Sequence, residues 1–122
     1  MSEIKSNPLK DKSYTFAIQI VRLSQYLVSE RREYVLSKQL LRSGTAVGAL
    51  IREGEFAASK ADFVNKFTVS LKEANETEFW LMLLKDTDYL DDDQFNVLDS
   101  QCKELISTLV SSIKTTKSRI NR

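Results

Sequence analysis

Few residue types in this 122-residue chain could perform acid–base, nucleophilic or metal chemistry. The sequence contains no histidine and one cysteine. Ser-His-Asp and Cys-His catalysis, histidine metal sites and an internal disulfide are therefore excluded. The remaining reactive groups are carboxylates, which gather in the stretches 73–78 and 91–93.

Both acidic stretches are explained better by helix structure than by metal binding. A di-iron bundle uses Glu-x-x-His motifs, and this chain has no histidine. An EF-hand needs spaced aspartates, a glycine and a terminal glutamate, whereas Asp91, Asp92 and Asp93 are consecutive and typical of a helix start. We predict no metal, no cofactor and no enzymatic activity. Catalysis by Glu73 or Glu78 with a metal is the alternative.

Glu78 occupies an apolar position on the expected third helix. A carboxylate buried there costs free energy unless a cation pairs with it. We predict a structural ion pair between Arg42 and Glu78, with Lys66 and Lys72 as the other available cations.

Apolar residues recur at spacings of three and four over the segments 12–28, 35–57, 60–85 and 92–119. Three glycines and one proline are too few for an all-β domain of this length. We predict an all-α protein, an antiparallel up-down-up-down four-helix bundle. Residues 1–122 form one domain in this interpretation, and residues 1–11 a flexible lead-in. Cys102 lies on the apolar stripe of the last segment, as an inert core thiol would.

The three glycines of the sequence all fall within the expected second helix. Each costs about 1 kcal/mol relative to alanine in a helix interior. Gly44 and Gly48 are one turn apart, which predicts close approach of a neighbouring helix. For Gly54, a helix break is the competing interpretation.

The first and third helices carry more apolar surface than one small bundle can bury. The apolar arc of the first covers roughly 200°, whereas a core-facing helix needs about 100°. The run 79–84 is apolar all round its helix. We therefore predict a homo-oligomer. The candidate interface residues are Ile18, Val21, Phe79, Trp80 and Leu83.

A net charge of +1 conceals an uneven distribution, because residues 1–60 and 102–122 are basic and residues 61–101 are acidic. Lys38, Arg42 and Arg52 lie within roughly 80° on the second helix, and Arg31 and Arg32 extend this basic face. It could follow a phosphate backbone, or form ion pairs with carboxylates of a neighbouring copy. No signal peptide or 18-residue apolar run is visible. We therefore expect a cytoplasmic protein that does not enter a membrane.

Two motifs give the chain a family resemblance: Arg42-Ser-Gly44 with Gly48, and Lys72-Glu73 with Glu76 and Trp80. The chain resembles the four-helix bundle proteins named for the intervening sequences of 23S ribosomal RNA genes. Their relatives include the accessory variability determinant proteins of diversity-generating retroelements. The resemblance implies an antiparallel four-helix bundle, a ring-like homopentamer and no catalysis. The retroelement relatives bind a reverse transcriptase and nucleic acid through a basic surface. Leu50 replaces the asparagine common in the family, so no polar role is transferred to that position.

Two functional hypotheses follow. The first is a non-enzymatic oligomeric bundle that acts as a binding or scaffolding module, with RNA or a nucleoprotein as a partner to test. The alternative is an accessory protein of a retroelement reverse transcriptase that binds nucleic acid through the basic face of the second helix. The residues of that basic face are Arg31, Arg32, Lys38, Arg42 and Arg52.

Overall fold

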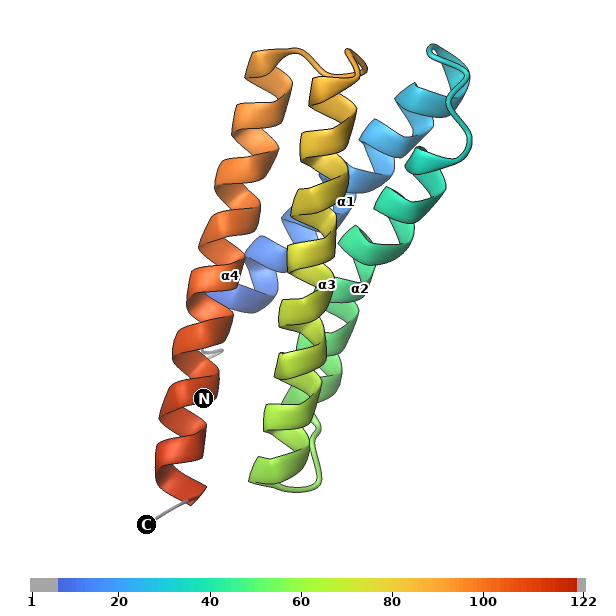
Figure 1. The fold of residues 1–122 in the computed structure, drawn as a ribbon. Coiled ribbons are helices and arrows are strands. Elements are labelled where there is room, and N and C mark those ends of the chain that lie inside the picture. The colour runs from blue at the N-terminus through green and yellow to red at the C-terminus, as the bar shows by residue number, and fades with distance from the viewer. Residues whose placement is uncertain (1–6, 121–122) are drawn as a thin grey trace, which may run out of the picture.

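Four long helices account for nearly all of residues 7–120, the part of the chain that the computed structural model describes. They are α1 (Pro8–Ser29), α2 (Leu36–Glu55), α3 (Lys60–Asp86) and α4 (Asp92–Ile120). Figure 1 shows that consecutive helices run in opposite directions. The predicted all-α antiparallel bundle is therefore confirmed.

α1 begins four residues earlier than the apolar pattern predicted. Pro8 occupies the first turn, where a helix needs no backbone N–H donor. The side chain of Asn7 caps this turn by accepting a hydrogen bond from the Lys10 backbone N–H at 3.2 Å. The prediction of a flexible lead-in over residues 1–11 is therefore wrong for residues 8–11. Residues 1–6 of that lead-in lie outside the described residues.

Side-chain caps explain where the other three helices begin. Asp91 and Gln94 cap α4 reciprocally: the Gln94 N–H donates to Asp91 Oδ1 at 2.7 Å, and the Asp91 N–H donates to Gln94 Oε1 at 3.0 Å. The acidic run thus has the capping role that the sequence indicated. Ser59 caps α3 by accepting from the Asp62 N–H at 3.0 Å. Glu33 accepts from three successive N–H groups at the start of α2, which the sequence analysis did not predict.

Close helix contacts occur at the three glycines of α2. A Cβ atom at Gly44 would lie 2.8 Å from Cγ2 of Ile20 on α1, and one at Gly48 would lie 3.3 Å from the Ser13 carbonyl oxygen. At Gly54 the nearest atom would belong to the Phe67 ring of α3, at 2.6 Å. α2 ends at Glu55, one residue after Gly54, so this glycine lies both at a close contact with α3 and in the last turn of its helix.

The helices do not pack equally along the bundle. α2 packs extensively on both α1 and α3, and α3 on α4, whereas α1 meets α4 over a shorter stretch. Figure 1 shows the α1–α2 hairpin leaning away from the α3–α4 hairpin at the end that carries the two hairpin connections. Within the described residues, no helix is long and apolar enough to cross a membrane. The largest core side chains are Phe16, Ile20, Leu27, Leu40, Ile51, Leu81, Leu84, Leu105 and Leu109.

Candidate interaction surfaces

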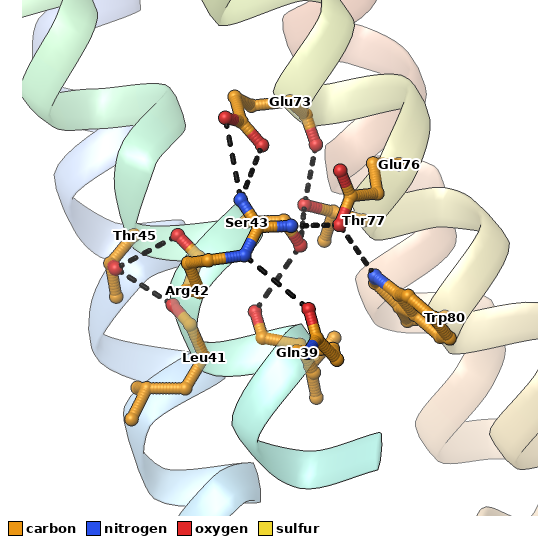
Figure 2. A network of polar contacts seen from close by, with 10 residues as sticks. Gln39, Leu41, Arg42, Ser43, Thr45, Glu73, Glu76, Thr77 and Trp80 are labelled. Carbon is orange, nitrogen blue, oxygen red and sulfur yellow. Dashed lines mark hydrogen bonds and ion pairs between the residues drawn. The ribbon is translucent and has the colours of Figure 1, made fainter. Parts of the chain in front are cut away.

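A polar network on the outer side of the α2–α3 interface centres on Arg42. Its Nη1 donates to Glu73 at 3.2 Å and its Nη2 donates to Glu76. Trp80 Nε1 donates to the same Glu76 carboxylate at 2.9 Å. Figure 2 shows the guanidinium between the two glutamates, with the indole on the far side of Glu76. Four motif residues of the family resemblance, Arg42, Glu73, Glu76 and Trp80, therefore meet in one contact between two helices.

This network changes the interpretation of the predicted basic face. Arg42 pairs with carboxylates of its own chain, so it is neither a free phosphate ligand nor the unpaired half of an ion pair between copies. Arg31 is also engaged: it donates to the carbonyl oxygens of Tyr89 and Asp88, and its guanidinium lies 4.8 Å from the Tyr89 ring centroid. Arg31 thus ties together the two connections at one end of the bundle.

The other residues of that basic face stay exposed. Arg32 lies in the α1–α2 connection with a positive φ of 53°, and Lys38 and Arg52 lie on α2. Among residues 7–120, no carboxylate lies within 4.0 Å of these three cations. Of the five residues predicted to form the basic face, Arg31 and Arg42 thus bind groups of their own chain. The other three have no carboxylate partner among residues 7–120.

The predicted ion pair between Arg42 and Glu78 is wrong. Glu78 pairs instead with Lys103 of α4, whose Nζ lies 3.0 Å from Glu78 Oε2 and 2.7 Å from Asp99 Oδ2. The reason is helical geometry: Glu78 is about 200° around the helix axis from Glu76, given 3.6 residues per turn. Glu76 faces α2 and Glu78 faces α4. The i,i+4 spacing of Asp99 and Lys103 was the sequence signal for this cluster.

The cluster of Glu78, Asp99 and Lys103 shifts the protonation of its members and of the neighbouring thiol. Burial opposes ionisation of Asp99, but the hydrogen bond from Lys103 and the positive charge of Lys103 outweigh it and lower the pKa of Asp99. Hydrogen bonds to Asp99 and Glu78 raise the pKa of Lys103. Burial, together with the nearby charges of Glu78 and Asp99, raises the pKa of Cys102 to about 12. This thiol also donates to the Ala74 carbonyl oxygen at 3.2 Å, so it is packed and protonated.

Several large apolar side chains are exposed on α1 and α3, and others on α4 and in the connections. On α1, Tyr14 is 69% exposed and Ile18 is 37% exposed. On α3, Phe79 is 57% exposed and Met82 is 50% exposed. Val21, Trp80 and Leu83 are only half-buried. The five predicted interface residues, Ile18, Val21, Phe79, Trp80 and Leu83, are all at least partly exposed, and Tyr14 and Met82 are exposed residues that were not among them. Tyr14 adjoins the wide apolar arc of the first helix, and Met82 lies within the apolar run 79–84.

A groove of about 510 Å³ runs along the apolar side of α1, where it borders α2. Its walls include Tyr14 and Ala17 of α1, and Gly48, Ala49 and Arg52 of α2. The small residues of α2 keep the groove open, since a larger side chain at Gly48 or Ala49 would fill it. The groove therefore adjoins the exposed Tyr14 of α1, and the charged residues Lys10, Asp11 and Arg52 also line it.

The fold and these surfaces define a class: an antiparallel four-helix bundle with exposed apolar faces. Within residues 7–120, no group of three or more histidine, cysteine, aspartate or glutamate side chains is arranged to hold a metal ion. The family model of the 23S rRNA-intervening sequence protein matches residues 5–111, and the chain belongs to this family.

One solved structure is similar over nearly the whole chain. It is the crystal structure of a protein of unknown function from the S23 ribosomal protein family of Bacteroides thetaiotaomicron VPI-5482. It shares 52% sequence identity and a TM-score of 0.86 with this chain, and the match covers 87% of this chain and 98% of that one. A comparison with curated proteins gave no match.

Proposed function

We propose that this protein is a non-enzymatic homo-oligomer of the cytoplasm that acts as a binding or scaffolding module. The family resemblance makes a ring of five copies the specific expectation. In this proposal the bundle supplies surfaces and no chemistry: its one thiol is buried and its most enclosed carboxylates are paired with a lysine.

The observation that carries the proposal is the presence of two different apolar faces on one chain. The α1 face contains Tyr14, Ile18 and Val21, and the α3 face contains Phe79 and Met82. α1 and α3 each pack on α2 and α4 and not on each other, so they occupy diagonal corners of the bundle. Contact between the α1 face of one copy and the α3 face of the next is heterologous, and repeating it closes a ring when the rotation fits.

Two charge variants and their mixture test this arrangement by light scattering coupled to size-exclusion chromatography. Ile18→Lys damages the α1 face and Phe79→Lys damages the α3 face, so each variant alone is expected to be monomeric. A mixture retains one intact face of each kind and should form heterodimers. Val97→Lys, at a 55% exposed apolar position on α4, is the matched control and should assemble like the unmodified chain. Variants that assemble normally, or a mixture that stays monomeric, would contradict a heterologous interface between these faces.

A second candidate function is nucleic-acid binding through the basic face of α2, as in an accessory protein of a reverse transcriptase. The observation that favours it is the exposure of Lys38 and Arg52 without a carboxylate partner among the described residues. Arg42 contributes less to this face because Glu73 and Glu76 neutralise it. RNA binding should then weaken as salt rises, since phosphate contacts release counterions. Binding that does not change between low and moderate salt would exclude this candidate.

A further inference from the structure

The outward sides of α1 and α3 carry two stripes of residues with the same spacing. The α1 stripe consists of Asp11, Tyr14, Ile18, Val21 and Gln25, and the α3 stripe consists of Lys72, Asn75, Phe79, Met82 and Asp86. Both follow steps of three, four, three and four residues, the heptad spacing by which two helices pair along a seam. All ten residues are exposed or half-buried. The two stripes can therefore pair between copies over about two heptads.

The α1 stripe is hollowed, and the α3 stripe carries a projecting ring. An open hollow of about 400 Å³ lies along the α1 stripe, with Tyr14, Ile18 and Val21 among its lining residues. Phe79 on the α3 stripe is 57% exposed, and its ring meets Trp80 edge to face with 5.1 Å between the ring centroids. An aromatic anchor of one copy thus has a hollow to fill on the next.

The charged residues at the ends of the stripes lack partners within their own chain. Among residues 7–120, no group of opposite charge lies within 4.0 Å of Asp11, Lys72, Asp86 or Arg22, which borders the α1 stripe. The helix dipole favours Asp11 in the first turn of α1 but disfavours Asp86 at the last residue of α3. Local helix stabilisation therefore does not account for Asp86.

The order of these charges distinguishes two ways of pairing the stripes. With the middle residues of the two stripes opposed, a parallel pairing places Asp11 opposite Lys72. It also brings Arg22 within one turn of Asp86. An antiparallel pairing about the same centre places Asp11 opposite Asp86 and brings Arg22 within one turn of Lys72. Parallel pairing thus joins opposite charges twice, whereas antiparallel pairing joins like charges twice.

The parallel direction is also the one that a ring of side-by-side copies requires. α1 and α3 run in the same direction within one copy, since each is antiparallel to α2 (Figure 1). Rotation about an axis along the bundle therefore sets α1 of one copy parallel to α3 of the next. Gly44 packs on Ile20, and its neighbour Ser43 accepts a hydrogen bond from Thr77 at 2.9 Å. Ile20 and Thr77 are thus at about the same level, so the middle residues of the stripes differ in level by about one helical turn.

We propose that α1 of one copy pairs in parallel with α3 of the next, in the register that sets Ile18 opposite Phe79. Phe79 fills the hollow on α1. Asp11 pairs with Lys72 at one end of the seam, and Arg22 pairs with Asp86 towards the other. This inference rests on the proposed function as an oligomer, and it adds the direction, the register and the ion pairs of the interface.

Charge reversal tests the pairing, with the concentration at which the oligomer dissociates measured by analytical ultracentrifugation at low salt. Asp11→Lys and Lys72→Asp each set like charges opposite each other, so each should raise this concentration by about tenfold or more. The double variant Asp11→Lys with Lys72→Asp restores opposite charges in every interface. It should return the dissociation to within about threefold of the unmodified chain. High salt should reduce these differences, because it screens exposed charges.

Two matched controls reverse charges away from the stripes. Asp92→Lys removes an acid from the first turn of α4, as Asp11→Lys does from α1, and Lys38→Asp reverses an exposed cation of α2. Both controls should assemble like the unmodified chain.

Stronger assembly of Asp11→Lys would overturn the proposal in favour of antiparallel pairing, in which this residue faces Asp86. Failure of the double variant to recover would overturn the register. A monomeric unmodified chain contradicts the proposed function, whereas an oligomer that none of these reversals affects contradicts this inference alone.

Discussion

At the residue scale, Arg42 has two charged partners on its own chain. It lies between Glu73 and Glu76, and its guanidinium is about half exposed. Replacing it leaves two like charges on adjacent turns of α3, which repel each other.

Arg42→Gln should therefore lower the free energy of unfolding by about 1 kcal/mol, a modest value because solvent screens the pair. Lys38→Gln removes the same charge from the same helix where no carboxylate is near, and should be neutral. Urea unfolding measures both. Equal effects of the two substitutions would show that the Arg42 network contributes nothing.

Glu78 gives a test of the corrected ion pair. Double-mutant cycles should show coupling between Glu78 and Lys103 on α4, and none between Glu78 and Arg42 on α2. The physical reason is that, among residues 7–120, Lys103 is the one cation within ion-pair distance of the Glu78 carboxylate, at 3.0 Å. Unfolding of Glu78→Gln, Lys103→Gln, Arg42→Gln and their pairwise combinations gives both couplings, and the reverse pattern would restore the Arg42 pairing.

The lowered pKa of Asp99 predicts that the folded protein loses stability at acidic pH. Its pKa in the folded chain lies below the value of about 3.9 expected when unfolded. Its contribution is therefore complete above about pH 4 and is lost as the pH falls through the lowered folded value. Thermal unfolding of the chain and of Asp99→Asn between neutral pH and pH 3 should show a smaller loss in the variant. Parallel curves would show that Asp99 has no lowered pKa.

Cys102 should be unreactive in the folded protein. Its thiol is fully buried, and its pKa of about 12 leaves almost no thiolate at neutral pH. Labelling with Ellman's reagent should be complete only after denaturant unfolds the bundle. Fast labelling under native conditions would show that α3 and α4 separate around this residue.

At the element scale, α1 and α2 depend on Gly44 for their close approach. Gly44→Ala would place a methyl group 2.8 Å from the branched side chain of Ile20, and overpacking of this kind costs about 1–3 kcal/mol. Gly48→Ala places its methyl at 3.3 Å from Ser13 and should cost less, since helix propensity improves in both variants. Thermal denaturation measures the loss of stability in each of the two variants. Gly44→Ala combined with Ile20→Ala should lose less stability than the two single changes predict together.

The sequence predicts the helices better than it predicts their relative rotation. The spacing of Phe95, Leu98, Cys102 and Leu105 defines the buried face of α4, because helical periodicity is local information. The early start of α1 was missed because it depends on how Asn7 caps the chain ahead of Pro8. The partner of Glu78 was missed because it depends on which side of α3 faces α4, and periodicity along one helix does not fix that.

At the scale of the whole molecule, the net charge of +1 conceals an uneven distribution of charge along the sequence. The exposed apolar surface is also unevenly distributed. The apolar faces lie on α1 and α3, at diagonal corners of the bundle. An oligomer built through the sides of the bundle leaves both ends accessible.

Native mass spectrometry of the unmodified chain at micromolar concentration tests the central claim most directly. The chain has a mass of 14.0 kDa. We predict one dominant species at a multiple of this mass, with five copies as the specific expectation from the family resemblance. A dominant 14.0 kDa species would contradict the proposal that the exposed faces of α1 and α3 form an interface between copies.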